Sequence, residues 1–173
     1  LIAALGMVPM AKAVGGFLIA PIVSGLLGIM IWREPPTATR LNIEIKSSPP
    51  GLDVPRAVVE LLRRFGKERE YVVSSFDLPA LLEVRAMAPE VTLALIGHGP
   101  EILPLAQRHH LPWIHAYHAT LDAGIVNEAH AHGIRVNVWT VDDPDALGMW
   151  AELGLDKLCT NRPAVMLAAQ QAS

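Results

Sequence analysis

The stretch Leu41-Asn42-Ile43-Glu44-Ile45-Lys46 has the alternating pattern of a short buried β-strand, with two charged residues near its end. Successive side chains of a strand point to opposite faces, so Glu44 and Lys46 share one face and the apolar residues share the other. A carboxylate and an ammonium group that both point inward are costly unless they bind something. The pair therefore predicts a site where Glu44 holds a cation and Lys46 an anionic group, with a structural ion pair as the alternative.

The alternation of strand and helix continues to the end of the chain. Apolar runs typical of strands lie at 41–46, 71–76, 91–96, 113–117, 134–141 and 156–160. Helical patterns follow each run, at 55–65, 78–88, 100–110, 122–132, 143–153 and 164–171. Repeated strand–helix units with short connections predict an α/β fold with a parallel sheet.

Polar and aromatic residues recur where the predicted strands end, among them Ser74, His98, His115, Trp139 and Thr160. In a (β/α) barrel these ends form the face that carries the active site. A doubly wound open sheet is disfavoured, because no glycine-rich stretch marks a nucleotide-binding loop. We therefore expect a partial TIM barrel with about six of the eight parallel strands of a closed barrel.

Residues 1–40 differ from the rest and are expected to be an apolar N-terminal segment followed by a linker, with the barrel at 41–173. Residues 13–32 carry no charge, and about 20 apolar residues suffice for a membrane-spanning helix. Pro21 and several glycines weaken a soluble helix, and Trp32 fits an interfacial anchor. A signal-like leader, a buried helix or the tail of an upstream membrane region are the alternatives, so the chain could be membrane-associated or cytoplasmic.

The composition excludes some classes of protein. The net charge of −3 argues against nucleic acid as a partner. The single cysteine, Cys159, excludes an internal disulfide, and we expect it to be buried.

None of the seven histidines has a zinc-site spacing, and His130 and His132 do not share a helix face. The pair Asp142-Asp143 is expected to begin a helix, where its charge favours the helix dipole.

Four motifs in this order resemble those of a known family: Leu-Asn-Ile-Glu-Ile-Lys at 41–46, Val-Ser-Ser-Phe-Asp at 73–77, Val-Asn-Val-Trp-Thr-Val-Asp-Asp at 136–143, and Leu-Gly-Leu-Asp-Lys-Leu-Cys-Thr-Asn-Arg-Pro at 153–163. Together they look like the second part of a glycerophosphodiester phosphodiesterase domain, which is a TIM barrel. The resemblance covers about residues 41 to 168.

The resemblance implies a metal-dependent phosphoric diester hydrolase that converts glycerophosphodiesters to an alcohol and glycerol 3-phosphate. It implies a divalent cation, Mg²⁺ or Ca²⁺, with Glu44 as one of its carboxylate ligands. Lys46 matches a lysine that faces the phosphate, and Trp139 matches an aromatic residue on the alcohol side of the substrate. From its place at a strand end, His115 is a further candidate for substrate contact.

Residues 1–40 lack the catalytic motifs that the resemblance would place before residue 41. The family's two catalytic histidines, in a His-Arg-Gly and a later His-Asp motif, and a Glu-x-Asp pair of metal ligands come before the strand that 41–46 matches. None of these motifs occurs there, so we expect no catalytic residue in this chain and no turnover by the chain alone. The alternative is a non-catalytic, membrane-anchored partial barrel that binds or scaffolds.

Overall fold

The computed structural model describes residues 41–46 and 51–172, and the expected membrane segment at 13–32 lies outside this range. The strands are β1 (Leu41–Ile45), β2 (Tyr71–Ser75), β3 (Thr92–Gly97), β4 (Trp113–Tyr117), β5 (Arg135–Trp139) and β6 (Lys157–Leu158). The α-helices are α2 (Val54–Phe65), α3 (Leu78–Met87), α4 (Ile102–Arg108), α5 (Ala123–Ala131), α6 (Leu147–Glu152) and α7 (Pro163–Ala172). Two 3₁₀ turns, η2 (His118–Thr120) and η3 (Pro144–Ala146), complete the described elements.

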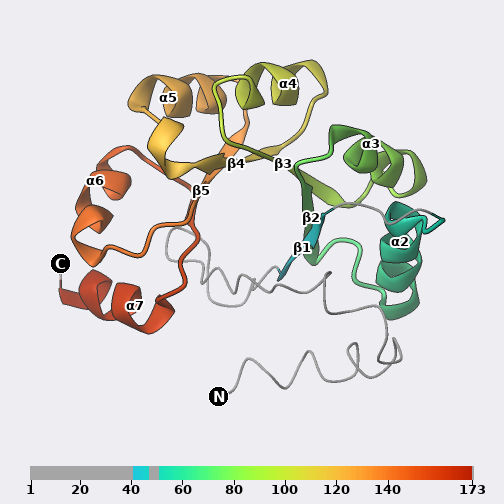
Figure 1. The fold of residues 1–173 in the computed structure, drawn as a ribbon, viewed down its shortest axis with the longest axis horizontal. Coiled ribbons are helices and arrows are strands. Elements are labelled where there is room, and N and C mark those ends of the chain that lie inside the picture. Colours follow the sequence, from blue (N-terminus) through green and yellow to red (C-terminus); the bar gives the residue numbers. More distant parts are fainter. Residues whose placement is uncertain (1–40, 47–50, 173) are drawn as a thin grey trace.

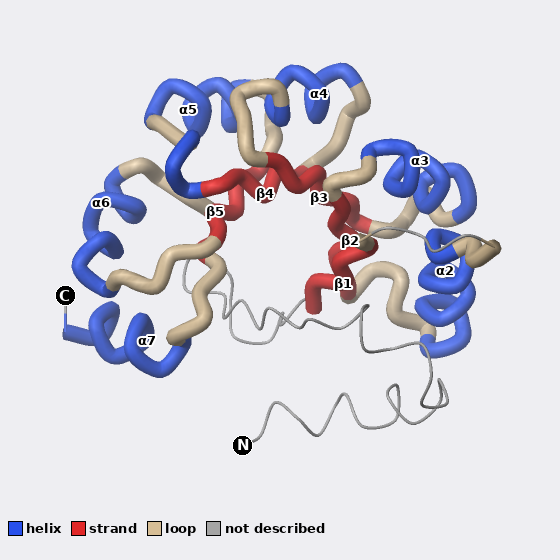
Figure 2. Tube along the Cα trace, in the orientation of Figure 1, coloured by secondary structure: helices blue, strands red, loops and turns tan. Residues whose placement is uncertain are grey.

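The six strands form one parallel sheet in the order β1-β2-β3-β4-β5-β6, so each strand pairs with the next one in the sequence. Figure 1 shows that the sheet curls and that the helices lie along its convex side. Figure 2 shows the strands as the inner layer of this arc. The architecture is that of a half-barrel and confirms the partial TIM barrel expected from the sequence.

The register assigns one set of residues to each side of the sheet. Leu95 pairs with Ile114, and Ile114 with Val136, and these three buried side chains belong to the core between the sheet and the helices. The neighbouring positions point to the concave side. There, Val72, Ala94 and Trp113 form a second, smaller buried cluster. The strands therefore carry an apolar face toward the helices and a mixed face toward the inside of the curl.

Capping residues define the ends of the helices. The Asp53 side chain accepts a hydrogen bond of 2.9 Å from the backbone N–H of Arg56 and begins α2. Gly66 ends the same helix in the left-handed conformation, at φ 61°, which glycine adopts at little cost. Asp122 caps α5 through the N–H of Ile125 at 2.9 Å.

Three details differ from the sequence-based expectation. The run 134–141 is not the longest strand, because β5 ends at Trp139 and Val141 then donates a backbone hydrogen bond to Cys159 O. The segment after Asp143 begins as the 3₁₀ turn η3 before α6 starts, and the Asp143 carboxylate accepts a hydrogen bond of 3.0 Å from the N–H of Asp145 in this turn. Asp77 stands at the N-cap of α3 but makes no side-chain cap hydrogen bond.

Candidate active site

Glu44 and Lys46 lie at the carboxyl end of β1, as the sequence predicts. Ile45, between them, is 1% exposed and packs in the core on the helix side, so the two charged residues belong to the concave side. Glu44 is half-buried and Lys46 is exposed. The ion pairs within the described residues do not include one between Glu44 and Lys46. Both charges thus remain open to a ligand rather than neutralising each other.

The end of β2 lies directly beside that of β1. Glu44 pairs with Ser74 in the register, and Ile45 pairs with Ser75. The Ser75 hydroxyl donates a hydrogen bond of 2.6 Å to the carbonyl of Ile45 and accepts one of 2.9 Å from the N–H of Asp77. Ser75 therefore fixes the β1 end against the turn into α3, and so holds the backbone that carries Glu44 and Lys46.

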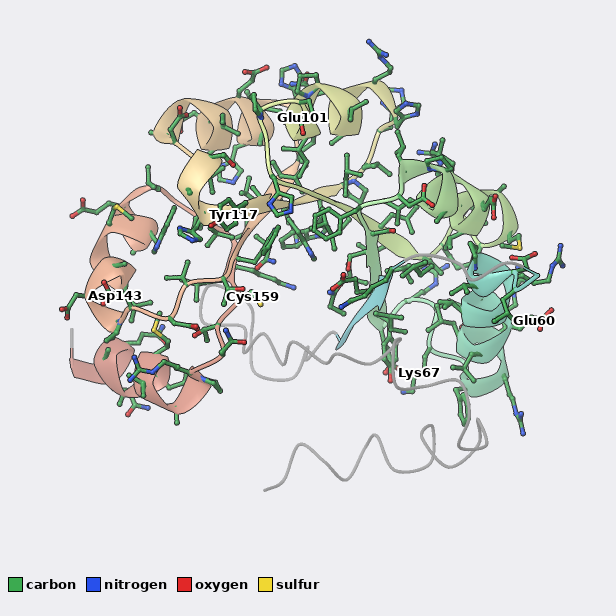
Figure 3. The ribbon with its side chains drawn as sticks, in the orientation of Figure 1. Glu60, Lys67, Glu101, Tyr117, Asp143 and Cys159 are labelled. Carbon is green, nitrogen blue, oxygen red and sulfur yellow. The ribbon has the colours of Figure 1, made fainter. Side chains whose placement is uncertain are left out.

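An aromatic rim follows the ends of the next strands. We define it as the contacting rings of Phe76, His98, Tyr117, His118 and Trp139. His98 stacks on Phe76 with ring centroids 5.3 Å apart, and it meets Trp139 edge-on at 4.9 Å. Tyr117 contacts Trp139 at 5.3 Å and His118 at 4.6 Å. Figure 3 shows Tyr117 on the concave side of the ribbon. The rim gives the carboxyl-end face an aromatic wall.

Trp139 is positioned within this rim by a hydrogen bond as well as by packing. Its indole N–H donates to the carbonyl of His115 at 2.8 Å, across the paired strands β4 and β5. Phe76 is 47% exposed, so the rim presents apolar surface at its outer edge. The arrangement can hold the organic part of a ligand against a ring whose orientation is fixed.

His115 lies deeper in the curl than the rim. Its side chain is 8% exposed, and its ring meets Trp113 edge-on at a centroid distance of 6.4 Å. Burial, with a smaller contribution from the positive charge of Lys157, lowers the pKa of His115 from 6.5 to about 3. Arg135 and Lys157 both lie over the Trp113 ring, at 5.4 and 4.7 Å. His115 is therefore a neutral imidazole at neutral pH, and it lies beside a tryptophan ring that two cationic side chains cover.

Asp142 has a role that the sequence did not predict. Its carboxylate accepts hydrogen bonds from the Thr160 hydroxyl at 2.9 Å, the Asn161 N–H at 2.7 Å and the Asn161 side-chain amide at 2.9 Å. The expectation that Asp142 begins a helix is wrong, because only Asp143 caps the following turn. Asp142 instead joins the loop after β5 to the loop after β6, so the two loops keep a fixed distance at the site face.

Removing the Asp142 carboxylate should loosen this connection. The hydrogen bonds from Asn161 come first among the causes that hold the pKa of Asp142 below 3.8. Their stabilisation is present above the ordinary pKa of the group and is lost as the pH falls through the lowered one. We expect Asp142→Ala to lower the melting temperature by a few degrees at pH 7 and by less at pH 2–3. Asp145→Ala removes an exposed carboxylate of the same segment and should leave the melting temperature nearly unchanged. Equal effects of the two substitutions would show that Asp142 does not join the two loops.

Cys159 lies on the concave side (Figure 3) and is 5% exposed, which confirms the expectation that it is buried. Burial is the main cause that raises the pKa of its thiol to about 11, and the carboxylates of Asp142 and Glu44 raise it further. Cys159 is a protonated thiol at neutral pH and is not a nucleophile.

The described residues provide only part of a metal site. Within residues 41–46 and 51–172, no three His, Cys, Asp or Glu side chains lie close enough together to hold a metal ion. Glu44 has the hard oxygen donors that Mg²⁺ and Ca²⁺ prefer, but a divalent cation takes six or more oxygen ligands. The described part of the chain therefore does not form a complete cation site. No helix in that part is both long and apolar enough to cross a membrane.

The structure thus brings Glu44, Lys46 and Trp139 to one face, with His115 below it. Phe76, His98 and Tyr117 were not predicted as partners of Trp139. Each is an aromatic or imidazole ring that ends or follows a strand, and this position is the only sequence feature that could have identified them. Their mutual contacts depend on the register and curl of the sheet, which the sequence does not reveal.

Comparison with known proteins supports this picture. A family model described as the glycerophosphoryl diester phosphodiesterase family matches residues 41–165. A glycerophosphodiester phosphodiesterase from Caldanaerobacter subterraneus subsp. tengcongensis is 24% identical over 132 residues, which make up 73% of this chain and 54% of that protein. The chain therefore spans about half the length of this relative.

Solved structures agree with the half-barrel. A crystal structure assigned to the glycerophosphoryl diester phosphodiesterases, from Silicibacter pomeroyi DSS-3, has a TM-score of 0.70 and 26% identity over 77% of this chain and 50% of its own. A phosphodiesterase from Oleispira antarctica, solved with the product sn-glycerol-3-phosphate, has a TM-score of 0.66 and 21% identity over 76% of this chain and 55% of its own, which shows the shared fold. The family match covers most of the sequence, and the chain belongs to the glycerophosphoryl diester phosphodiesterase family.

Proposed function

We propose that this domain serves the hydrolysis of glycerophosphodiesters to an alcohol and glycerol 3-phosphate, and that residues 41–172 supply the substrate-binding side of the site. The observation that carries the proposal is the placement of Glu44 and Lys46, unpaired with each other, at the end of β1 within a matched family domain. A cation ligand and a phosphate-binding group at adjacent positions suit a phosphodiester.

In this proposal Lys46 contacts a phosphate oxygen and neutralises part of its charge. A divalent cation, Mg²⁺ or Ca²⁺, would supply further positive charge to the phosphoryl group, with Glu44 as one of its ligands. The P–O bond to the alcohol breaks when water adds to phosphorus, and the alcohol leaves with a proton. The family resemblance implies that the histidines that move these protons come before the strand that 41–46 matches.

The position of the aromatic rim suggests how the substrate is oriented. Neighbouring strands lie about 4.8 Å apart, so the ends of β2 and β3 lie roughly 5 and 10 Å from the end of β1. A phosphate held by Lys46 would therefore bring the organic groups of a small diester to Phe76 and His98, and Trp139 would line the far wall. The glycerol 3-phosphate bound by the Oleispira antarctica phosphodiesterase is a ligand of this size and chemistry.

A second function, binding without turnover, is favoured by the incomplete cation site in the described part of the chain. The described residues contain no group of three metal-ligating side chains. A partial barrel with this face could bind a glycerophosphodiester or its product and yet leave it intact.

Two measurements on the 173-residue chain separate these functions. With millimolar glycerophosphocholine and Mg²⁺ we expect no release of glycerol 3-phosphate above the blank, because the His-Arg-Gly and His-Asp motifs of the family do not occur in residues 1–40. Millimolar glycerol 3-phosphate with Mg²⁺ should nevertheless raise the melting temperature, since a ligand that binds only the folded state stabilises it. Clear turnover would contradict the expected inactivity of the chain, and the absence of any thermal shift would contradict the binding role of this face.

A further inference from the structure

Ser74 and Ser75 are adjacent, equally buried and chemically identical, yet only one of them has hydrogen-bond partners. Both are 0% exposed. Ser75 on the helix side makes two hydrogen bonds, to Ile45 and Asp77. The Ser74 hydroxyl, on the concave side, has no partner in the described part of the chain. A buried hydroxyl without a hydrogen-bond partner lowers the stability of the folded state. We therefore infer that another state of the protein supplies a partner for Ser74.

The position of Ser74 indicates which partner that is. Ser74 pairs directly with Glu44 in the parallel register, and the two side chains share one side of the sheet. Paired residues on neighbouring strands lie about 4.8 Å apart, and a glutamate side chain is long enough to bring a carboxylate oxygen to a hydroxyl over that distance. The carboxylate of Glu44 is half-buried rather than locked in the core, so its side chain has room to turn.

We propose that Ser74 is a positioning residue for Glu44. When a ligand occupies the face, the Glu44 carboxylate turns toward it, one oxygen accepts a hydrogen bond from the Ser74 hydroxyl, and the other faces the ligand. Without ligand the carboxylate turns away and leaves the hydroxyl unpaired. The inference rests on the proposed function, because it requires Glu44 to act on a glycerophosphate ligand. It adds Ser74 to the site and separates its role from that of Ser75.

A stability measurement tests the free state, with Ser75 as the matched control. Each serine is changed to alanine in the full 173-residue chain, and urea unfolding is followed without ligand. Ser75→Ala should raise the unfolding equilibrium constant roughly thirtyfold, since it removes two hydrogen bonds. Ser74→Ala should leave the constant unchanged or lower it, because the change removes an unpaired buried hydroxyl. A Ser74→Ala variant destabilised as much as Ser75→Ala would show that Ser74 already has a structural partner and would overturn the inference.

A ligand measurement tests the bound state. The probe is millimolar glycerol 3-phosphate with Mg²⁺, and the readout is the rise in melting temperature, which needs no turnover. Ser74→Ala should reduce the wild-type rise by more than half. Ser74→Thr, which keeps the hydroxyl, should restore most of it. A structural role alone would not produce this rescue by threonine.

The outcomes distinguish the inference from the proposed function. If Glu44→Gln removes the ligand-induced rise and Ser74→Ala does not, the proposed site stands and the role of Ser74 is refuted. If Glu44→Gln keeps the full rise, the ligand binds elsewhere and the proposed site is refuted together with the inference. If the wild-type chain shows no rise, both are overturned.

Discussion

Acidification from pH 7 to pH 4 should progressively destabilise the domain, with His115 responsible for a large share of the loss. Burial, aided by the positive charge of Lys157, lowers the pKa of His115 to about 3, against 6.5 for an ordinary histidine. Between these two values the unfolded chain binds a proton that the folded chain does not. The free energy of unfolding therefore falls as the pH drops below about 6.5, with a slope that one group limits to about 1.4 kcal/mol per pH unit.

The experiment is urea unfolding at several pH values from 7 to 4.5 for the wild type, His115→Asn and His110→Asn. His115→Asn replaces the imidazole with a side chain that does not titrate, so its stability should change less steeply with pH. His110 is exposed and stands at φ 50°, a conformation that asparagine tolerates, which makes His110→Asn a suitable control. Parallel pH curves for His115→Asn and the wild type would rule out His115 as the source.

The neutral state of His115 also constrains its chemistry at the site. A buried imidazole that stays uncharged at neutral pH can donate or accept a hydrogen bond, but it cannot supply a positive charge to a phosphate. His115 was expected at a strand end but lies in the middle of β4, below the rim. If it contacts substrate, that contact is a neutral hydrogen bond. The phosphate charge is then left to Lys46 and to a bound cation.

The sequence predicted the order of elements because each strand and helix carries its own local signal. Alternation marked β1, and helical patterns at 55–65 and 122–132 marked α2 and α5. These signals involve residues within about four positions of one another, so they do not depend on the rest of the fold. The half-barrel followed from their repetition, because short connections between parallel strands leave few topologies.

Features that depend on contacts between distant strands were not predicted. Asp142 was expected to begin a helix, yet it binds Thr160 and Asn161, which are about twenty positions away. The aromatic rim likewise joins rings from four successive strands, and only the register brings His98 against both Phe76 and Trp139. Ser74 and Ser75 are equivalent in the sequence, and only their opposite faces in the sheet separate a structural hydroxyl from one that awaits a partner.

Glu44→Gln should cause a large loss of activity in any active form of the protein that contains these residues. Glutamine keeps the shape of the side chain but removes the negative charge that attracts a cation, and its amide nitrogen cannot act as a ligand. We expect kcat/KM for glycerophosphocholine to fall roughly a hundredfold or more, which corresponds to about 3 kcal/mol of lost transition-state stabilisation. A higher Mg²⁺ concentration should restore part of the activity if Glu44 is a cation ligand.

The matched control for this change is Glu60→Gln on α2, because Glu60 lies on the outer side of the half-barrel, away from the concave face (Figure 3). Glu60→Gln should leave both kcat/KM and the dependence on Mg²⁺ unchanged. Glu44→Gln should also leave the free energy of unfolding unchanged or slightly higher, since Glu44 forms no ion pair with Lys46 that the substitution could break. A large loss of activity without a loss of stability identifies a residue kept for function, whereas near-normal rates in Glu44→Gln would remove Glu44 from the site.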